Sequence, residues 1–334
     1  VDQNRLIEFP FFYTIHQDNP PLQIENEGDV RFLETLFRQG IAELIRSEGY
    51  SDEMLRSILD LILTTCSARY QVPENLLNKG KGQILVKRFF HLLEENHHGN
   101  LIIIGGAEDK KGEKSILKYL CGIINKEEDL ILIVTAASEL PVESGMEYKA
   151  VFRELGVKNI DTMNINNRNE AQDEKNIKLL ESAYLVFFTG GDQLRITSLL
   201  GGTKLYRKMI EKFNGGCIFA GTSAGASVMC DTMIISGLDE ESPRKCTLKM
   251  APGLGVIKGA IIDQHFAQRG RTGRMLVAVA ENPESLGIGI DEDTAIVVNR
   301  KGEIKVIGSG AVYIFDGSGI SYSNIPEQHL NEIF

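Results

Sequence analysis

The sequence predicts an α/β protein with a doubly wound, mostly parallel β-sheet, preceded by a helical N-terminal segment. From residue 101 onward, short apolar runs alternate with amphipathic helical patterns. The runs at 101–104 and 130–134 contain no polar residue, as expected of strands that helices cover on both faces. Residues 29–69 instead place their apolar side chains at three- and four-residue steps, which is typical of helices.

Helical periodicity defines the N-terminal segment. We expect helices over 29–48 and 52–69 and a third over about 82–95. The polar stretch 94–100 then marks a boundary. The sequence therefore predicts two parts: a helical segment at 1–98 and an α/β domain at 99–334.

The α/β domain is expected to alternate strands and helices. Predicted strands lie at 101–105, 130–135, 159–163, 184–188, 217–221, 257–262, 287–290, 294–298, 304–308 and 311–315. Predicted helices lie at 112–124, 143–155, 169–181, 192–199, 203–213, 224–230 and 271–281. This order places ligand chemistry at the carboxyl ends of the strands.

Composition excludes several classes of protein. The 334 residues include 46 acidic and 36 basic ones, so the net charge of −10 argues against nucleic acid as a partner. No apolar run approaches the roughly 18 residues that span a membrane, and no signal peptide is visible. The five cysteines lie far apart and show no zinc-ligand spacing. We expect no disulfide framework, metal or cofactor, and a reducing, cytoplasmic location.

The candidate nucleophile is Ser223, in the G-x-S-x-G sequence at 221–225. An apolar strand precedes this sequence and small residues follow it, as at a strand–turn–helix nucleophile elbow. The backbone N–H of Ala224 at the helix start is the first candidate oxyanion donor. A glycine-rich turn with a capping serine fits the same pattern.

The base that such a serine needs is predicted to be His265, which follows the apolar run 256–262. Of the six histidines, four lie before residue 100 and another in the polar C-terminal tail. His265 therefore has the best placement at a strand end. A structural histidine that caps the strand is the alternative.

The carboxylate that orients the base is expected among Asp291, Glu292 and Asp293, between two predicted strands. Asp263 is less favoured because it lies so close to His265 in sequence. The order serine, histidine, acid differs from that of α/β-hydrolases, so the motif does not indicate a lipase or an esterase.

Two glycine-containing loops follow predicted strands, at 105–109 and 190–193. Neither has the spacing of a phosphate-binding motif. We expect Gly190 or Gly191 to supply a second oxyanion donor and Gln193 to face the substrate. The 105–109 loop fits a plain strand-to-helix turn equally well.

Three arginines, Arg269, Arg271 and Arg274, follow the candidate base. Guanidinium groups suit paired hydrogen bonds to a carboxylate, which we favour over a phosphate. A solvated charged face is the simpler alternative.

Taken in order, the motifs at 105–109, 190–193, 221–226 and 263–274 resemble those of the cyanophycinases. More broadly they resemble the serine peptidases related to the aspartyl dipeptidase peptidase E. The segments 241–245 and 250–255 are also similar to that family, and the resemblance covers about 100–320.

The resemblance implies a glutamine-amidotransferase-like fold, a homodimer and no metal. The implied substrate is cyanophycin, a poly-aspartate that carries arginine on each β-carboxyl and is released as β-Asp-Arg dipeptides. It implies Ser223 as nucleophile, His265 as base and Glu292 as acid, with attack expected at the β-aspartyl isopeptide carbonyl. The implied substrate-binding residues are Gln193, Asp263, Gln264, Arg269, Arg271 and Arg274. Asp192 or a residue near Glu240 is expected to meet the substrate arginine.

Alternative functions remain open at this point. One is an isoaspartyl dipeptidase of the peptidase E type. Another is a regulator that uses the hydrolase domain as a sensor. It is suggested by residues 1–98, which are similar to the linker region of AraC-type regulators but stop before a DNA-binding motif. A glutaminase-type amidotransferase is disfavoured because the elbow carries serine and not cysteine.

Overall fold

The computed structural model describes residues 27–45, isolated positions between 54 and 89, and residues 101–237, 248–298, 304–320 and 322. The chain divides into two compact units, Val1–Arg88 and Phe89–Phe334. The boundary expected near residue 98 falls outside the described residues and stays a prediction.

In the first unit, helix α2 spans Glu27–Ile45 and corresponds to the helix predicted at 29–48. Leu33 and Leu36 of this helix form a buried apolar cluster with Ile58 and Ile62. Both pairs have the three- or four-residue spacing that puts side chains on one helical face. The isolated described positions between 54 and 89 are helical.

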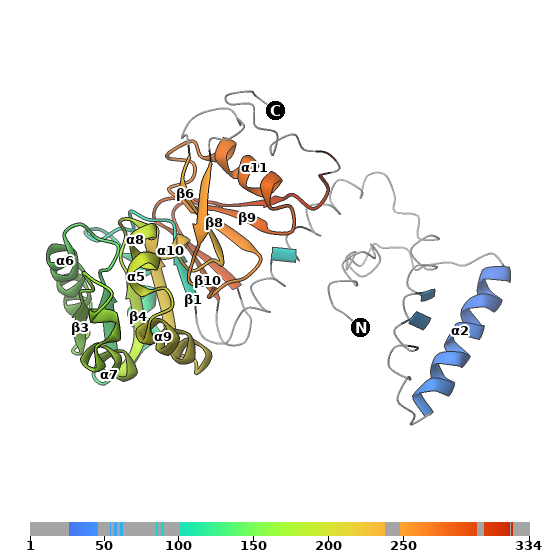
Figure 1. The fold of residues 1–334 in the computed structure, drawn as a ribbon, viewed down its shortest axis with the longest axis horizontal. Helices are drawn as coiled ribbons and strands as arrows, with labels where there is room; N and C mark the ends of the chain where they lie inside the picture. The colour runs from blue at the N-terminus through green and yellow to red at the C-terminus, as the bar shows by residue number, and fades with distance from the viewer. Residues whose placement is uncertain are drawn as a thin grey trace. The chain divides into compact units, whose positions relative to one another are not determined.

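The second unit is built on a seven-stranded sheet with the order β11-β10-β1-β5-β4-β2-β3 (Figure 1). Its strands are β1 (Leu101–Ile104), β2 (Leu130–Val134), β3 (Ile160–Met163), β4 (Ala183–Phe188), β5 (Ile218–Thr222), β10 (Thr294–Val298) and β11 (Ile304–Gly308). The strands from β1 to β3 in that order pair in parallel, whereas β10 and β11 extend the edge antiparallel. The predicted mostly parallel sheet is confirmed.

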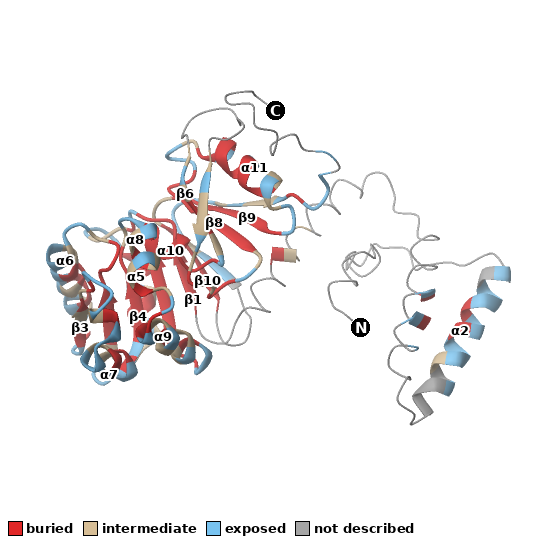
Figure 2. Ribbon diagram, in the orientation of Figure 1, coloured by how far each residue is buried: buried red, intermediate tan, exposed pale blue. Residues whose placement is uncertain are grey.

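Helices cover the two faces of this sheet. On one face, α5 (Ser115–Gly122) and α6 (Pro141–Glu154) pack on a core that includes Ile102, Ile133 and Phe187. On the other, Phe213 of α9 (Lys204–Asn214) contacts Phe219 of β5. The remaining helices before β5 are the 3₁₀ turn η2 (Glu170–Gln172), α7 (Glu174–Ser182) and α8 (Gln193–Leu200). The strands are buried between these layers (Figure 2), which explains their continuous apolar runs.

The C-terminal strands form a separate three-stranded sheet, in the order β12-β9-β8. These strands are β8 (Ala260–Gln264), β9 (Leu286–Ile290) and β12 (Val312–Asp316), and α11 (Thr272–Glu281) connects the first two. Glycines in β9 allow this packing, because a Cβ at Gly289 would collide with the ring of Phe266. The sequence pattern identified these strands but did not predict that they leave the main sheet.

A hairpin of β6 (Thr232–Ser236) and β7 (Lys249–Pro252) was not predicted. Several predicted boundaries also shift, and the helix expected at 169–181 is the 3₁₀ turn η2 followed by α7. The helix expected at 224–230 is the shorter α10 (Ala224–Ser227). The strand expected at 257–262 is β8, which continues to Gln264 and so places His265 directly at the strand end.

The core should depend strongly on Phe219, which is fully buried with ring centroids 5.7 Å from Phe188 and 5.2 Å from Phe213. We expect Phe219→Ala to lower the free energy of unfolding by about 3–5 kcal/mol, since the cavity cannot fully collapse. Urea unfolding followed by circular dichroism measures this change. The matched control is Phe37→Ala, on the exposed face of α2; an equally small effect of both variants would contradict the prediction.

Candidate active site

Ser223 occupies a sharp turn between the buried strand β5 and helix α10. Its backbone has φ 53° and ψ −114°, a conformation that non-glycine residues rarely adopt. The flanking glycines are required by close packing, because a Cβ at Gly221 would collide with the carbonyl of Gly225. The strand–turn–helix context predicted for the G-x-S-x-G sequence is therefore present.

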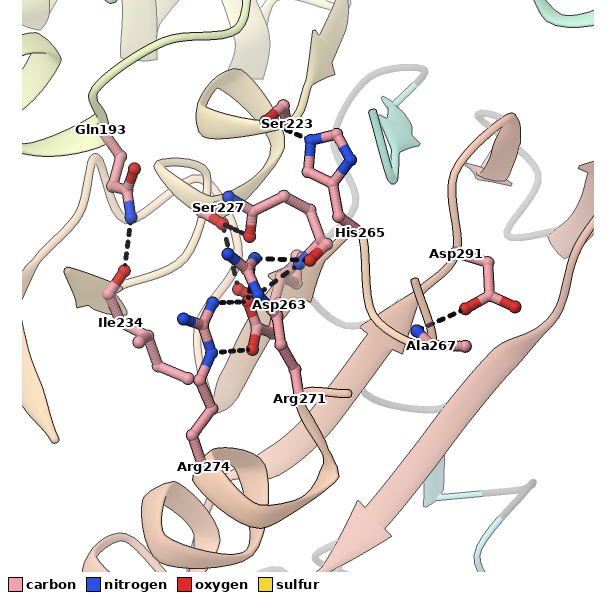
Figure 3. A network of polar contacts seen from close by, with 12 residues as sticks. Gln193, Ser223, Ser227, Ile234, Asp263, His265, Ala267, Arg271, Arg274 and Asp291 are labelled. Atoms are coloured by element: carbon pink, nitrogen blue, oxygen red, sulfur yellow. Dashed lines mark hydrogen bonds and ion pairs between the residues drawn. The ribbon is translucent and has the colours of Figure 1, made fainter. Parts of the chain in front are cut away.

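His265 lies directly after β8, also with positive φ (49°). Its Nε2 is 2.9 Å from Ser223 Oγ, and its Nδ1 is 2.6 Å from Glu292 Oε1. Figure 3 shows the His265 ring pointing toward Ser223. The structure thus joins the predicted nucleophile, base and acid in one chain of hydrogen bonds. This geometry is that of a serine-hydrolase triad.

The three acids in the β9–β10 turn have different partners. Asp291 accepts hydrogen bonds from the backbone N–H groups of Ala267 (2.9 Å) and Ala311 (3.0 Å). Asp293 accepts from the N–H of Asp109 at 2.9 Å. Of these acids, only Glu292 is hydrogen-bonded to His265, so tertiary contacts distinguish residues that the sequence left equivalent.

Backbone carbonyl groups at the end of β1 and in the loop after it accept hydrogen bonds from the nucleophile, the base and the residue after the acid. The carbonyl of Ile104 accepts from the N–H of Ser223 (3.0 Å), and the carbonyl of Gly105 accepts from that of His265 (2.8 Å). The carbonyl of Gly106 accepts from the N–H of Asp293, beside Glu292 (2.9 Å). A Cβ at Gly106 would collide with the His265 ring, and φ is +100° there. The 105–109 loop is therefore a structural part of the site and more than a plain connecting turn.

Burial lowers the pKa of His265 below its ordinary value of 6.5. The hydrogen bond to Glu292 raises this pKa, while the positive charges of Arg269 and Arg271 lower it further. The net shift is downward, so the imidazole is neutral at neutral pH. A neutral imidazole can accept the proton of a serine hydroxyl.

The predicted oxyanion donors are both available. Among the described residues, the backbone N–H groups of Ala224 and Gly191 donate to no protein acceptor. A Cβ at the neighbouring Gly190 would lie 3.3 Å from the Cβ of Ser223, so this loop borders the nucleophile. Gly191 has φ +138° and approaches the carbonyl of Ala137 so closely that a Cβ would collide with it.

Two of the predicted substrate-binding arginines contact Asp263, which is fully buried. Arg274 Nε donates to Asp263 Oδ2 at 2.6 Å, and its Nη2 donates to Oδ1. Arg271 Nη1 donates to Asp263 Oδ1 at 3.2 Å and to the carbonyl of Gln264 at 2.6 Å. The Asp263 carboxylate thus accepts hydrogen bonds from two guanidinium groups, as the dashed lines in Figure 3 mark.

The remaining predicted binding residues have different surroundings. Gln193 Nε2 donates to the carbonyl of Ile234 at 2.6 Å, and Gln264 Oε1 accepts from Ser227 Oγ at 3.0 Å. Arg269 is exposed. Asp192 caps α8 by accepting from the N–H of Leu194 at 2.8 Å, while Glu240 lies outside the described residues.

Sequence reasoning missed Glu108, Tyr148, Thr222 and Ser227 as parts of this region. Glu108 is buried and accepts hydrogen bonds from Tyr148 Oη and Thr222 Oγ1. An acidic residue in a loop gives no sequence signal that it is buried. The only available hint was its position at the carboxyl end of a strand.

The described residues give no support to a cysteine nucleophile, a metal site or a membrane-spanning helix. Burial raises the pKa of Cys121 to about 11 and also raises that of Cys230, so both remain protonated thiols. No group of three His, Cys, Asp or Glu side chains there could hold a metal ion. No described helix has both the length and the apolar character to cross a bilayer.

Comparison with known proteins gives matches over this same unit. A cyanophycinase from Geminocystis herdmanii is 40% identical over 226 residues, which cover 67% of this chain and 83% of that protein. A cyanophycinase from Trichormus variabilis is 40% identical over 233 residues, 70% of this chain and 78% of that protein. The crystal structure of a peptidase from an acI-B1 Actinobacterium has a similar fold, with a TM-score of 0.51 and 24% identity over 66% of this chain and 91% of that one.

The family model of Peptidase family S51 matches residues 101–307. This region begins with β1 and includes Ser223, His265 and Glu292 with the loops that hold them. The chain therefore belongs to peptidase family S51.

Proposed function

We propose that this protein is a cyanophycinase, a serine peptidase that degrades cyanophycin to β-Asp-Arg dipeptides. The observation that carries the proposal is the hydrogen-bonded chain Ser223–His265–Glu292 at 2.9 and 2.6 Å. It occurs in a chain that is 40% identical to two cyanophycinases. The geometry of the three residues supports the reaction type, and the similarity to cyanophycinases supports the choice of substrate.

The product identifies the bond that is cleaved. A β-Asp-Arg dipeptide still contains its isopeptide linkage, so release of this dipeptide cleaves the main-chain amide between aspartyl units. The expectation that Ser223 attacks the isopeptide carbonyl is therefore corrected on chemical grounds. The β-linked arginine is a recognition feature of the substrate.

Acylation begins when His265 Nε2 takes the proton of Ser223 Oγ and the oxygen attacks the main-chain carbonyl carbon. Glu292 accepts a hydrogen bond from Nδ1, which holds the ring and stabilises the imidazolium. The imidazolium then gives its proton to the leaving amine nitrogen as the C–N bond breaks. The result is an ester between Ser223 and the aspartyl unit.

The backbone N–H groups of Ala224 and Gly191 are proposed to bind the oxyanion in this step and in deacylation. Neither N–H group donates a hydrogen bond to another acceptor among the residues that the structure describes, so both are available to the oxyanion. Water, activated by His265, then attacks the ester. The aspartyl carboxyl group leaves and Ser223 regains its proton.

Arg271 and Arg274, held by Asp263, are proposed to bind the free carboxylate of a β-linked arginine, because both aspartyl carboxyl groups of the polymer are in amide bonds. Asp263 orients Arg271 and Arg274 through hydrogen bonds to both guanidinium groups. Gln193, Gln264 and Arg269 are proposed to complete the binding site around the acyl unit. Asp263 itself is a supporting group in this scheme.

The family resemblance supports two further proposals about the whole protein, a glutamine-amidotransferase-like fold and a homodimer. Helical periodicity supports a helical appendage at 1–98, and the cysteine pattern supports a cytoplasmic location. Analytical ultracentrifugation of the full chain tests the dimer. Residues 1–98 keep open the proposal of a sensor-type regulator, which a DNA gel shift tests.

Removal of the nucleophile should abolish turnover. We expect Ser223→Ala and His265→Ala each to lower kcat by about 10⁶-fold, because the two residues act as a unit. Glu292→Gln should lower it by about 10⁴-fold and leave measurable activity. Release of β-Asp-Arg from cyanophycin, quantified by mass spectrometry, measures these effects.

The matched control is Ser182→Ala, at the end of α7, which should keep wild-type turnover. Wild-type activity of Ser223→Ala would refute the mechanism. Loss of activity in Asp291→Asn together with its retention in Glu292→Gln would assign the acid to Asp291.

The acid limb of kcat/KM should have its midpoint below pH 6.5, because catalysis needs neutral His265 and its pKa is lowered. Arg269→Gln removes a positive charge that lowers this pKa, so the midpoint should move to higher pH. Initial rates at low substrate between pH 4 and 8 measure the midpoint. Arg153→Gln, at the end of α6, is the control that should leave it unchanged; a fixed or lower midpoint in Arg269→Gln would contradict the assignment.

The polymer should be preferred over small substrates. We expect rapid β-Asp-Arg release from cyanophycin and slow hydrolysis of isoaspartyl dipeptides, compared at equal enzyme concentration. The reverse preference would identify a dipeptidase of the peptidase E type.

A further inference from the structure

Glu108 is a buried carboxylate that the proposed mechanism does not use. It lies in the 105–109 loop and is 4% exposed. Tyr148 Oη donates to its Oε1 and Thr222 Oγ1 donates to its Oε2. Two hydroxyl groups from distant parts of the chain thus share one acceptor group.

One of these hydroxyls belongs to the residue directly before the nucleophile. Thr222 is the last residue of β5 and is adjacent to Ile104 in the parallel β1–β5 pair. Ser223 follows with φ 53° and ψ −114°, so the turn begins at Thr222. Such a conformation persists only where the surroundings hold it.

The other side of Glu108 is anchored to the core. The ring of Tyr148, on α6, lies 4.7 Å from that of Phe187 and 6.4 Å from that of Phe152, centroid to centroid. Lys110 Nζ lies 4.1 Å above the Tyr148 ring. The Glu108 carboxylate is therefore held by Tyr148 of α6, which packs against β4, and it accepts the hydrogen bond of Thr222 on its other oxygen.

We propose that Glu108 is a positioning residue, which acts through the Thr222 hydroxyl to hold the nucleophile elbow with Ser223 Oγ directed at His265. The proposal rests on the proposed function of Ser223. Charge-assisted O–H···O bonds are strong and directional, and this one fixes the residue at which the strained turn begins. Among the residues that the structure describes, the hydrogen-bond partners of Glu108 are Tyr148 and Thr222, and neither Ser223 nor His265, so its effect passes through Thr222.

The test uses Thr222→Val, which keeps the shape of the side chain and removes the hydroxyl that donates to Glu108. The readout is the rate at which a fluorophosphonate probe labels the full chain: Ser223 Oγ bonds to phosphorus and fluoride leaves. This rate reports nucleophile placement without any assumption about the natural substrate. We expect labelling to slow by about 10²-fold, the cost of a small misplacement of reacting groups.

Two variants separate positioning from general stability. Thr222→Ser keeps the hydroxyl and should restore the labelling rate. Tyr148→Phe removes the other hydroxyl from the same carboxylate and should destabilise the fold comparably, yet label close to the wild-type rate because the Thr222 bond remains. Melting temperatures of all variants accompany the rates.

Wild-type labelling of Thr222→Val, or equally slow labelling of Thr222→Ser, overturns the proposal. If Thr222→Val does not fold, Glu108→Gln decides the question: the neutral amide weakens the bond, so slow labelling supports the proposal and wild-type labelling overturns it. Ser223→Ala must not be labelled. Labelling of that variant would instead refute the proposed function, so the two failures are distinguishable.

Discussion

The site depends on a short run of backbone at the end of β1. Three consecutive carbonyl groups, of Ile104, Gly105 and Gly106, accept hydrogen bonds from the N–H groups of Ser223, His265 and Asp293. These three residues follow three different strands, in both sheets of the unit. Backbone hydrogen bonds are short and directional, so they register the nucleophile, the base and the residue next to the acid against the end of β1 and its loop. Glycine at 105 and 106 is needed because side chains there would collide with Asp291 and His265.

Conformational strain is concentrated around the same contacts. Ser223, His265, Asp293 and Ala107 all have positive φ without being glycine. Each lies directly after a buried strand or in the loop that links them, where the sheet resists relaxation. The strain permits hydroxyl, imidazole and carboxylate to point toward one another from separate strand ends. Rigid strands therefore do the positioning, and the turns present the reactive atoms.

Electrostatics in the site differ from those of the chain as a whole. The protein carries a net charge of −10, yet Arg271 and Arg274 converge on the single buried carboxylate of Asp263. A chain with net negative charge is suited to attract a substrate rich in arginine side chains. Arg269 and Arg271 also help burial to keep His265 neutral. Arg271, which is also a proposed substrate-binding residue, thus contributes to keeping the base neutral.

The sequence by itself determined the main elements of the α/β unit. Runs such as 101–104 and 130–134 contain no polar residue, which is typical of a strand that helices cover on both faces. It also determined Ser223 and His265 as candidates, since their positions after apolar runs put them at strand ends. Tertiary structure decided among Asp291, Glu292 and Asp293, because neighbours in one turn point at different partners. It also decided the separate β8–β9–β12 sheet, the pairing of Arg271 and Arg274 with Asp263, and the burial of Glu108. These features depend on contacts between residues far apart in the chain, and local pattern carries no information about them.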